Sequence, residues 1–295
     1  MRSTLDVSES HVARVGRLSV RRALPRRGRR MVGAWCFLDH MGPSAVTRTA
    51  SLDVGPHPHC GLQTVTWLIE GEALHRDSLG SEQVVSPGEL NLMTTGHGVA
   101  HSEEATDQYA GDLEGAQLWI ALPEATRDGA ATFEHHGDLP GVDLNGAEAT
   151  VFVGAFAGVT SPARVDSDVV GVDLDLRGST DVALRADFEH ALVVLRGRVL
   201  VDGVALTPGQ LGFIGVGVDE ARVEPLAGAR VLLIGGRPFA EEIAMWWNFV
   251  ARTREEIEAA RESWTTRDAR FGDVASPLPR LDAPAPYWWT SARSA

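Results

Sequence analysis

The sequence contains no lysine, so all 27 basic side chains are arginines. Without lysine there can be no Schiff-base lysine and no phosphate-binding lysine of a P-loop. Arginine stays protonated and is a poor general base. Proton transfer in this protein must therefore depend on histidine or on carboxylate side chains.

Acidic side chains outnumber basic ones, 40 to 27, so the formal net charge is −13 and the sequence pI is about 5.2. An acidic surface repels phosphate backbones, so we do not expect direct binding to nucleic acid. Arginines nevertheless gather between Arg14 and Arg30. This stretch is either an arm that binds an anion or nucleic acid or, in the interpretation we prefer, a solvated loop between strands.

Cysteine is also rare, with only Cys36 and Cys60. Two cysteines are too few for a disulfide framework in a chain of this length, and a reducing compartment fits. Residues 1–7 carry no apolar segment of a signal peptide, and no apolar run reaches membrane-spanning length. We therefore expect a soluble, cytoplasmic protein without a membrane segment.

Short β-strand signals dominate the rest of the chain. Residues 64–69 and 116–122 are rich in β-branched, aromatic and aliphatic side chains, and Pro87-Gly88 marks a turn. Many short strands without amphipathic helices between them predict a barrel or a sandwich. The exception is a capping box at residues 253–256, which predicts a helix over Ile257 to Trp264.

The two halves of the chain share a local pattern. Residues 68–71 and 194–197 both read apolar-apolar-x-Gly, and each is followed by Pro-Gly-x-Leu, at residues 87–90 and 208–211. The recurrence in the same order suggests a duplicated barrel. Residues 135–148 are rich in Gly, Asp, Asn and Pro and are the expected linker. The expected divisions are residues 1–134, the linker 135–148, residues 149–236 and a tail over 237–295.

Four residues form a metal-binding pattern, the pairs His57-Pro58-His59 and His101-Ser102-Glu103. On a strand, residues i and i+2 point to one face, so two such strands could aim three imidazoles and one carboxylate at one point. A lone strand histidine is more often a hydrogen-bonded structural residue, but two such pairs beside turns favour metal. Imidazole and carboxylate suit Zn, Fe, Ni, Cu and Mn, and an octahedral ion would keep two open positions.

Other polar residues near this pattern could support it. Gln63 follows His59 by four residues and could orient a ligand or a substrate, and His97 could shuttle a proton or lie exposed in its loop. We interpret His75 as structural and His40 as a buried, hydrogen-bonded residue. The second half contains one histidine, His190, so we expect no metal there.

Four segments are similar to motifs of the pirin family, a branch of the cupin superfamily. They are residues 37–43, residues 56–65 around the first histidine pair, residues 93–103 around the second pair, and Gly235-Gly236-Arg237-Pro238 followed by residues 247–250. The resemblance implies an all-β bicupin fold, with two double-stranded β-helix (jelly-roll) barrels and a short C-terminal helix. It also implies one divalent metal in the amino-terminal barrel, held by His57, His59, His101 and Glu103. Iron is the usual metal, with Ni, Mn, Cu or Zn as alternatives.

The resemblance implies two kinds of function. Some pirins resemble quercetin 2,3-dioxygenases, which open a flavonol ring with O₂ and release carbon monoxide; others act as regulators, either transcription cofactors or binders of metabolic enzymes. We rank first a dioxygenase acting on a flavonol-like aromatic, with Glu103, His97 and Gln63 as catalytic candidates. The alternatives are a metal-dependent regulator with a protein partner, or a structural bicupin with a vestigial site. Whatever the function, we expect a monomer. Many cupins have Glu where this chain has Gln63, so acid-base chemistry at that position is in doubt.

Overall fold

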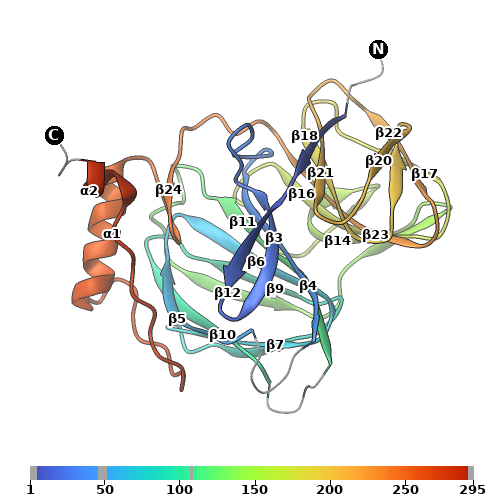
Figure 1. Ribbon diagram of the computed structural model, residues 1–295. Coiled ribbons are helices and arrows are strands. Elements are labelled where there is room, and N and C mark those ends of the chain that lie inside the picture. The colour runs from blue at the N-terminus through green and yellow to red at the C-terminus, as the bar shows by residue number, and fades with distance from the viewer. Residues whose placement is uncertain (1–4, 46–51, 107–108, 110, 292–295) are drawn as a thin grey trace.

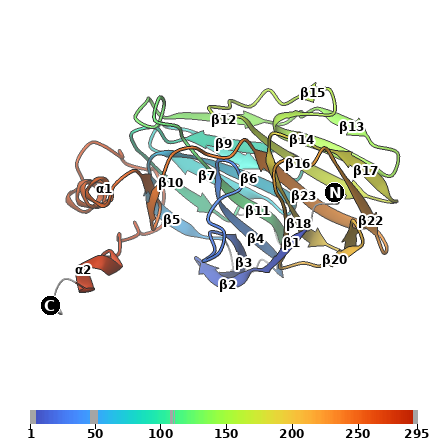
Figure 2. The ribbon, with the colours of Figure 1, turned by 90° about the horizontal axis from the view of Figure 1, so that it is seen from above.

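The computed structural model describes residues 5–45, 52–106, 109 and 111–291. The expected all-β architecture is confirmed: nearly every element is a strand, and the strands form two barrels side by side (Figure 1). Two short helices lie beside the first barrel, on the side away from the second (Figures 1 and 2). Among the described residues, no helix has both the length and the apolar character needed to cross a membrane.

The first barrel consists of a seven-stranded and a four-stranded sheet. The larger sheet has the order β12-β9-β6-β11-β4-β3-β2, and its strands are β2 (His11–Val15), β3 (Leu18–Leu24), β4 (Trp35–Ala45), β6 (Leu62–Glu70), β9 (Leu90–Thr94), β11 (Asp112–Ala121) and β12 (Thr132–His136). The smaller sheet has the order β5-β10-β7-β8, and its strands are β5 (Val54–His59), β7 (Ala73–Asp77), β8 (Glu82–Val85) and β10 (Val99–Glu104).

The second barrel repeats this plan. Its larger sheet has the order β1-β21-β18-β23-β16-β14-β13, with β15 paired to β14; the strands are β1 (Asp6–Glu9), β13 (Gly141–Asp143), β14 (Ala147–Phe156), β15 (Val159–Thr160), β16 (Val169–Leu176), β18 (Glu189–Arg196), β21 (Gln210–Ile214) and β23 (Ala229–Gly236). The smaller sheet has the order β17-β22-β19-β20, and its strands are β17 (Thr180–Ala183), β19 (Val199–Val201), β20 (Val204–Leu206) and β22 (Glu220–Pro225).

The strand orders show that the repeated sequence pattern is a structural duplication. Strand β6 corresponds to β18, and the turn glycines that follow them, Gly71 and Gly197, both have positive φ, at 89° and 79°. The glycines of the two Pro-Gly turns, Gly88 and Gly209, also match, at 82° and 94°. Left-handed backbone of this kind strongly favours glycine, so the shared pattern marks equivalent turns.

The edge strands differ from the expected division of the chain. Strand β1 lies within residues 1–134, yet it pairs with β21 of the second barrel, Asp6 opposite Phe213. The range proposed as a linker is also partly strand, because β12 ends at His136 and β13 spans residues 141–143. We retain the division at residues 135–148 as a proposal, with β1 exchanged into the second barrel.

The larger sheets of the two barrels pack face to face around one apolar cluster. Trp35, Trp67 and Leu118 of the first barrel lie in this cluster with Phe152 and Ile234 of the second. The indole of Trp67 stacks on Phe152, with ring centroids 5.0 Å apart. This continuous core explains why the barrels form one body, since burying apolar side chains of this size contributes about 1.5–3 kcal/mol each.

The arginine-rich stretch is not the solvated loop that we preferred from the sequence. Most of it forms strands β2 and β3, and several of its arginines contact their own chain. Arg21 donates to the carbonyl of Gly42, and Arg29 pairs with Asp6 at 3.0 Å. In β3 the buried Leu18 and Val20 alternate with the exposed Ser19 and the half-buried Arg21, which is typical of a half-exposed strand and explains the difference.

The tail forms the predicted helix. Helix α1 spans Arg254–Thr266, and the side chain of Thr253 accepts from the backbone N–H of Glu256, as the capping box predicts. The buried face of α1 packs on Cys60 and Ala100 of the smaller sheet. Hairpin β24 (Ala244–Trp246) and β25 (Phe249–Ala251) precedes this helix, and α2 (Tyr287–Ser291) follows it.

Candidate metal centre

Strands β5 and β10 bring the two predicted histidine pairs together. The strands are antiparallel with His57 opposite His101, and the alternation of a strand places His59 on the same face as His57. One ring nitrogen from each of His57, His59 and His101 lies within 4.8 Å of the others. All three side chains are buried, so the imidazoles converge inside the first barrel.

The tautomer of His57 follows from its hydrogen bond. Its Nδ1 lies 2.9 Å from the carbonyl oxygen of Gly55, which can only accept. Nδ1 therefore carries the proton, and the lone pair of Nε2 is available to a ligand.

The tautomer of His101 follows from a hydrogen-bonded chain of three side chains, His101, His75 and Asp77. Its Nδ1 lies 3.3 Å from Nδ1 of His75, and Nε2 of His75 lies 3.1 Å from a carboxylate oxygen of Asp77. The backbone amides of Leu79 and Ser81 also donate to this carboxylate, and the pKa of Asp77 is lowered, so it accepts from His75. His75 must then accept from His101, which leaves the Nε2 lone pair of His101 free.

The three imidazoles fit a divalent cation. Nδ1 of His59 and Nε2 of His101 are buried without a hydrogen-bond partner, which is costly unless another ligand occupies the site. Burial lowers the pKa of His57 to about 4 and lowers the pKa values of His59 and His101 well below the ordinary value. Neutral imidazoles at physiological pH are the form that binds Fe, Ni, Cu or Zn.

Glu103 lies in the same cavity but outside this compact group. The register between β5 and β10 shifts after His101, so Glu103 is opposite Val54, and its carboxylate accepts from the hydroxyl of Thr66 at 3.4 Å. Burial raises the pKa of Glu103 to about 7. The structure thus brings together three of the four predicted ligands and places the fourth beside them.

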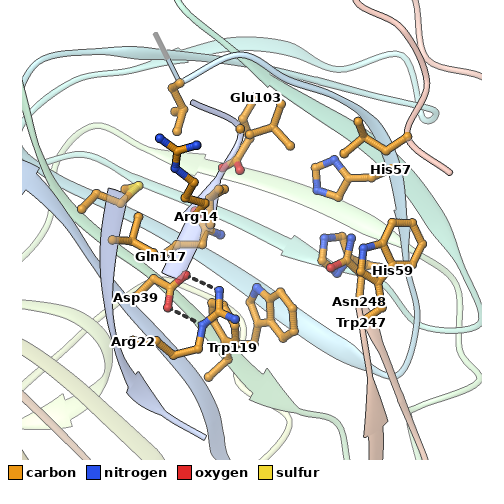
Figure 3. Close-up of a pocket in the computed structure, with 18 of the residues that line it drawn as sticks. Arg14, Arg22, Asp39, His57, His59, Glu103, Gln117, Trp119, Trp247 and Asn248 are labelled. Atoms are coloured by element: carbon orange, nitrogen blue, oxygen red, sulfur yellow. Dashed lines mark hydrogen bonds and ion pairs between the residues drawn. The ribbon is translucent and has the colours of Figure 1, made fainter. Parts of the chain in front are cut away.

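A cavity of about 480 Å³ opens from these histidines (Figure 3). Its wall includes Phe37 and Trp119, which stack with ring centroids 3.9 Å apart, and the edge of Trp119 meets His59. Trp247 and Asn248, at the turn between β24 and β25, lie beside His59 (Figure 3). The arrangement suits a planar aromatic molecule held next to the imidazoles.

One ion pair lines the cavity. Arg22 donates two hydrogen bonds to Asp39, each 2.7 Å long, and its guanidinium also covers the ring of Phe37 (Figure 3). Burial raises the pKa of Asp39 although Arg22 opposes this shift. The bidentate pair neutralises both charges, and the contact of the guanidinium with Phe37 holds that ring in place.

Gln63 and His97, the other two catalytic candidates, do not line this cavity. Gln63 is fully buried, but its amide donates to the hydroxyl of Thr94 and to the carbonyl of Arg164. His97 lies on a surface loop with more than half of its side chain exposed, 3.7 Å from Asp128. Their positions give no support for a catalytic role.

The remaining histidines show what the sequence analysis found and missed. His40 is buried and contacts Glu114, as expected. His135 and His136 are half-buried on β12. His75 was interpreted as structural, yet it orients a candidate ligand; its one signal in the sequence is the His-x-Asp spacing with Asp77, which puts both side chains on one face of β7.

Known proteins resemble this chain over most of its length. Residues 17–120 match the family model described as Pirin, and residues 169–272 match the Pirin C-terminal cupin domain. These matches confirm the bicupin expectation. The two segments correspond to the first barrel and to the second barrel with part of the tail.

Individual relatives agree. A Pseudomonas aeruginosa protein provisionally named quercetin 2,3-dioxygenase is 48% identical over 276 residues, which cover 92% of this chain and 87% of that protein. A pirin-like protein of Caulobacter vibrioides is 37% identical over 88% of this chain and 92% of its own length. The crystal structure of a quercetin 2,3-dioxygenase from Acinetobacter baumannii matches with a TM-score of 0.92 and 46% identity, covering 95% of each chain.

Proposed function

The chain belongs to the pirin family, and from this premise we propose that it is a metal-dependent dioxygenase acting on a flavonol-like aromatic. The observation that carries the proposal is the convergence of three neutral, buried imidazoles on one side of an aromatic-walled cavity. The names of the similar Pseudomonas and Acinetobacter proteins support the same reaction class.

His57, His59 and His101 would hold one divalent metal, with Glu103 as the fourth ligand. Iron is our first choice, and Ni, Mn, Cu or Zn would also suit these ligands. When bound, the metal supplies Lewis acidity and open positions for substrate oxygen and O₂. In the reaction both atoms of O₂ enter the product, and one ring carbon leaves as carbon monoxide.

The protein side chains have separate tasks in this reaction. Glu103, whose carboxylate lines the same cavity, would take the proton from the substrate hydroxyl onto a carboxylate oxygen. Phe37 and Trp119 would pack against the planar substrate, and the buried cavity would exclude water. Gln63 and His97 have no part in this proposal.

The test is turnover of quercetin by metal-reconstituted protein, followed by loss of flavonol absorbance and by release of carbon monoxide. We expect turnover by the wild type and none by His101→Ala, which removes a metal-binding imidazole. His97→Ala is the matched control, because it removes an imidazole outside the cavity and should retain activity. No turnover above that of His101→Ala would overturn the dioxygenase proposal.

Other expectations also remain proposals. A cytoplasmic location fits two cysteines that are free and buried. A monomer is our proposal for the oligomeric state. The regulatory alternative expected a partner surface at the arginine-rich stretch. Arg21, Arg22 and Arg29 of that stretch make internal contacts, so we do not develop this alternative further.

A further inference from the structure

The second barrel has its own cavity, at the level where the first barrel carries its aromatic wall. Thr64 and His190 each precede their turn glycine, Gly71 or Gly197, by seven residues. Thr64 pairs with Trp119, whereas His190 pairs with Gly235. A bulky residue of the first barrel is thus replaced by a glycine in the second, and this leaves room for the ring of His190.

The glycine is required for this placement. A Cβ atom added at Gly235 would lie 2.6 Å from Cδ2 of His190, closer than any real contact. On the corresponding level of β16, Val170 takes the place that Phe37 has on β4. Small residues at these two positions and the inward imidazole leave a cavity of about 340 Å³.

The lining of this cavity is mostly apolar. It is formed by the β14–β15 hairpin, by the residues after β17 and by the inward faces of β16, β18 and β23; its side chains include Phe156, Val159, Val170, Leu184, Leu233 and His190. Binding sites for small molecules have this character, an apolar hollow with very few polar groups that set the orientation of the ligand.

The lining includes the polar side chains of Thr160, Arg185 and His190, and of these His190 is the buried one. It has no hydrogen-bond partner among the residues the structure describes. Its side chain is 2% exposed, and its Nδ1 is fully buried and unpaired. Burial lowers the pKa of His190 to about 4, so the ring is neutral. Leaving a buried polar group unpaired is unfavourable, and a ligand that hydrogen-bonds to the imidazole would offset this cost.

The charges at the rim are already matched. Arg185 donates two hydrogen bonds to Asp187 and covers the ring of Phe188 at 3.8 Å. Arg237 pairs with Asp187 and with Asp168. Two guanidinium groups thus face two carboxylates, and no excess charge favours an ionic ligand.

We propose that this cavity binds a small, uncharged, largely apolar molecule that carries one hydroxyl group and hydrogen-bonds through it to His190. The site is separate from the metal centre and does not depend on the proposed reaction. A single-ring phenol has the size, the planarity and the hydroxyl group that the cavity and the imidazole require.

The test uses the full-length, zinc-loaded protein with ¹⁵N-labelled histidine rings, titrated with phenol, toluene or benzoate. Phenol should shift the His190 ring signals saturably and bind about tenfold more tightly than toluene, the worth of one hydrogen bond. Benzoate should bind more weakly than phenol. The His190 signal is assigned by its loss in His190→Phe.

Two variants separate the imidazole from the cavity. His190→Phe keeps a ring and removes both nitrogens, so its preference for phenol over toluene should disappear, as followed by the ligand signals. Ala155→Trp, at an exposed position on the rim, should block both ligands without affecting the core. The proposal is overturned if phenol leaves the His190 signals unchanged up to its solubility limit, if benzoate binds more tightly than phenol, or if either variant binds phenol as the wild type does.

Discussion

The two barrels have the same strand order, but the inward side chains of their smaller sheets differ: they are polar in the first barrel and aliphatic in the second. In the first barrel the inward positions of the smaller sheet carry His57, His101 and Glu103, and they border a cavity. In the second barrel, inward positions of the paired strands β17 and β22 carry Val182 and Ala221, which lie in a continuous aliphatic core. Glycine turns and backbone pairing therefore specify the barrel, while the inward side chains of the smaller sheet decide whether that part of the interior is a polar cavity or an aliphatic core.

The comparison also shows how a hollow barrel stays folded. The first barrel leaves part of its interior to polar groups, but its larger sheet is covered on the other face by the second barrel. Trp67 of the first barrel donates to Asp173 of the second at 2.7 Å, and Arg230 neutralises Asp173. The second barrel thus stabilises the first by covering the apolar outer face of its larger sheet.

The largest effect expected from this contrast is on metal content. His101→Ala should reduce the bound metal from about one ion per chain to almost none, because it leaves only two imidazoles in the compact group. His190→Phe, which removes the histidine of the second barrel, should leave the metal content unchanged. Elemental analysis of both variants tests the contrast, and loss of metal from His190→Phe would contradict it.

A polar side chain should not be tolerated in the aliphatic core at Val182, a residue that does not line the cavity at His190. Val182→His would put an imidazole without partners into the aliphatic core, so we expect the free energy of unfolding to fall by about 3 kcal/mol. Urea unfolding measures this change. Glu220→His, at an exposed position of the paired strand, is the control and should cost less than about 0.5 kcal/mol. Equal losses in the two variants would show that the interiors do not differ as described.

The His75–Asp77 chain has no counterpart in the second barrel that involves a candidate ligand, and its effect should be limited to the metal. His75→Phe preserves the ring that stacks on Phe133 but no longer accepts from His101. We expect metal affinity to fall 10- to 100-fold in competition with a chelator, with a change in the spectrum of the bound metal. His75→Gln, whose amide oxygen can accept, should recover part of the affinity. Unchanged affinity in His75→Phe would mean that the contact has only a structural role.

The smallest effect concerns the contribution of His190, in the second barrel, to the pH dependence of the free energy of unfolding. The unfolded chain takes up a proton on His190 below about pH 6.5, whereas the folded protein, with a pKa of about 4, does not. The unfolded state binds more protons between these values, so the free energy of unfolding falls as the pH falls, by about 2 kcal/mol at pH 5.

His190→Phe provides the comparison for this measurement. The variant should lose this part of the pH dependence, and the difference between the two curves removes contributions from the metal centre. Urea unfolding between pH 7 and pH 5 gives both curves. Parallel curves would show that His190 is protonated alike in the folded and unfolded states.

Much of the fold is readable from local sequence. The turn glycines Gly71 and Gly197 and the capping box at Thr253 act through neighbouring residues, so their structures could be predicted. The position of β1 could not, because it depends on pairing with residues about two hundred positions away. Strands β2 and β3 were missed for a related reason: Arg22 of β3 pairs with Asp39 of β4, a partner that the local sequence does not identify.

The site divides in the same way. The i, i+2 spacing placed His57 and His59 on one face, and the antiparallel pairing of β5 with β10 brought His101 opposite His57. Gln63 does not line the cavity, because the turn at Gly61, with φ of 72°, separates β5 from β6 and the side chain then faces the second barrel. The role of His75 depends on the register between β7 and β10, which has no local signal.

The exchanged edge strand has a consequence for synthesis of the chain. Residues 6–9 are synthesised long before the strand with which they pair, residues 210–214. The first barrel can therefore begin to fold while strand β1 still lacks its pairing partner in the second barrel. Release of an isolated first half would leave those backbone amides and carbonyls without their partner, and they would be open to pairing with other chains.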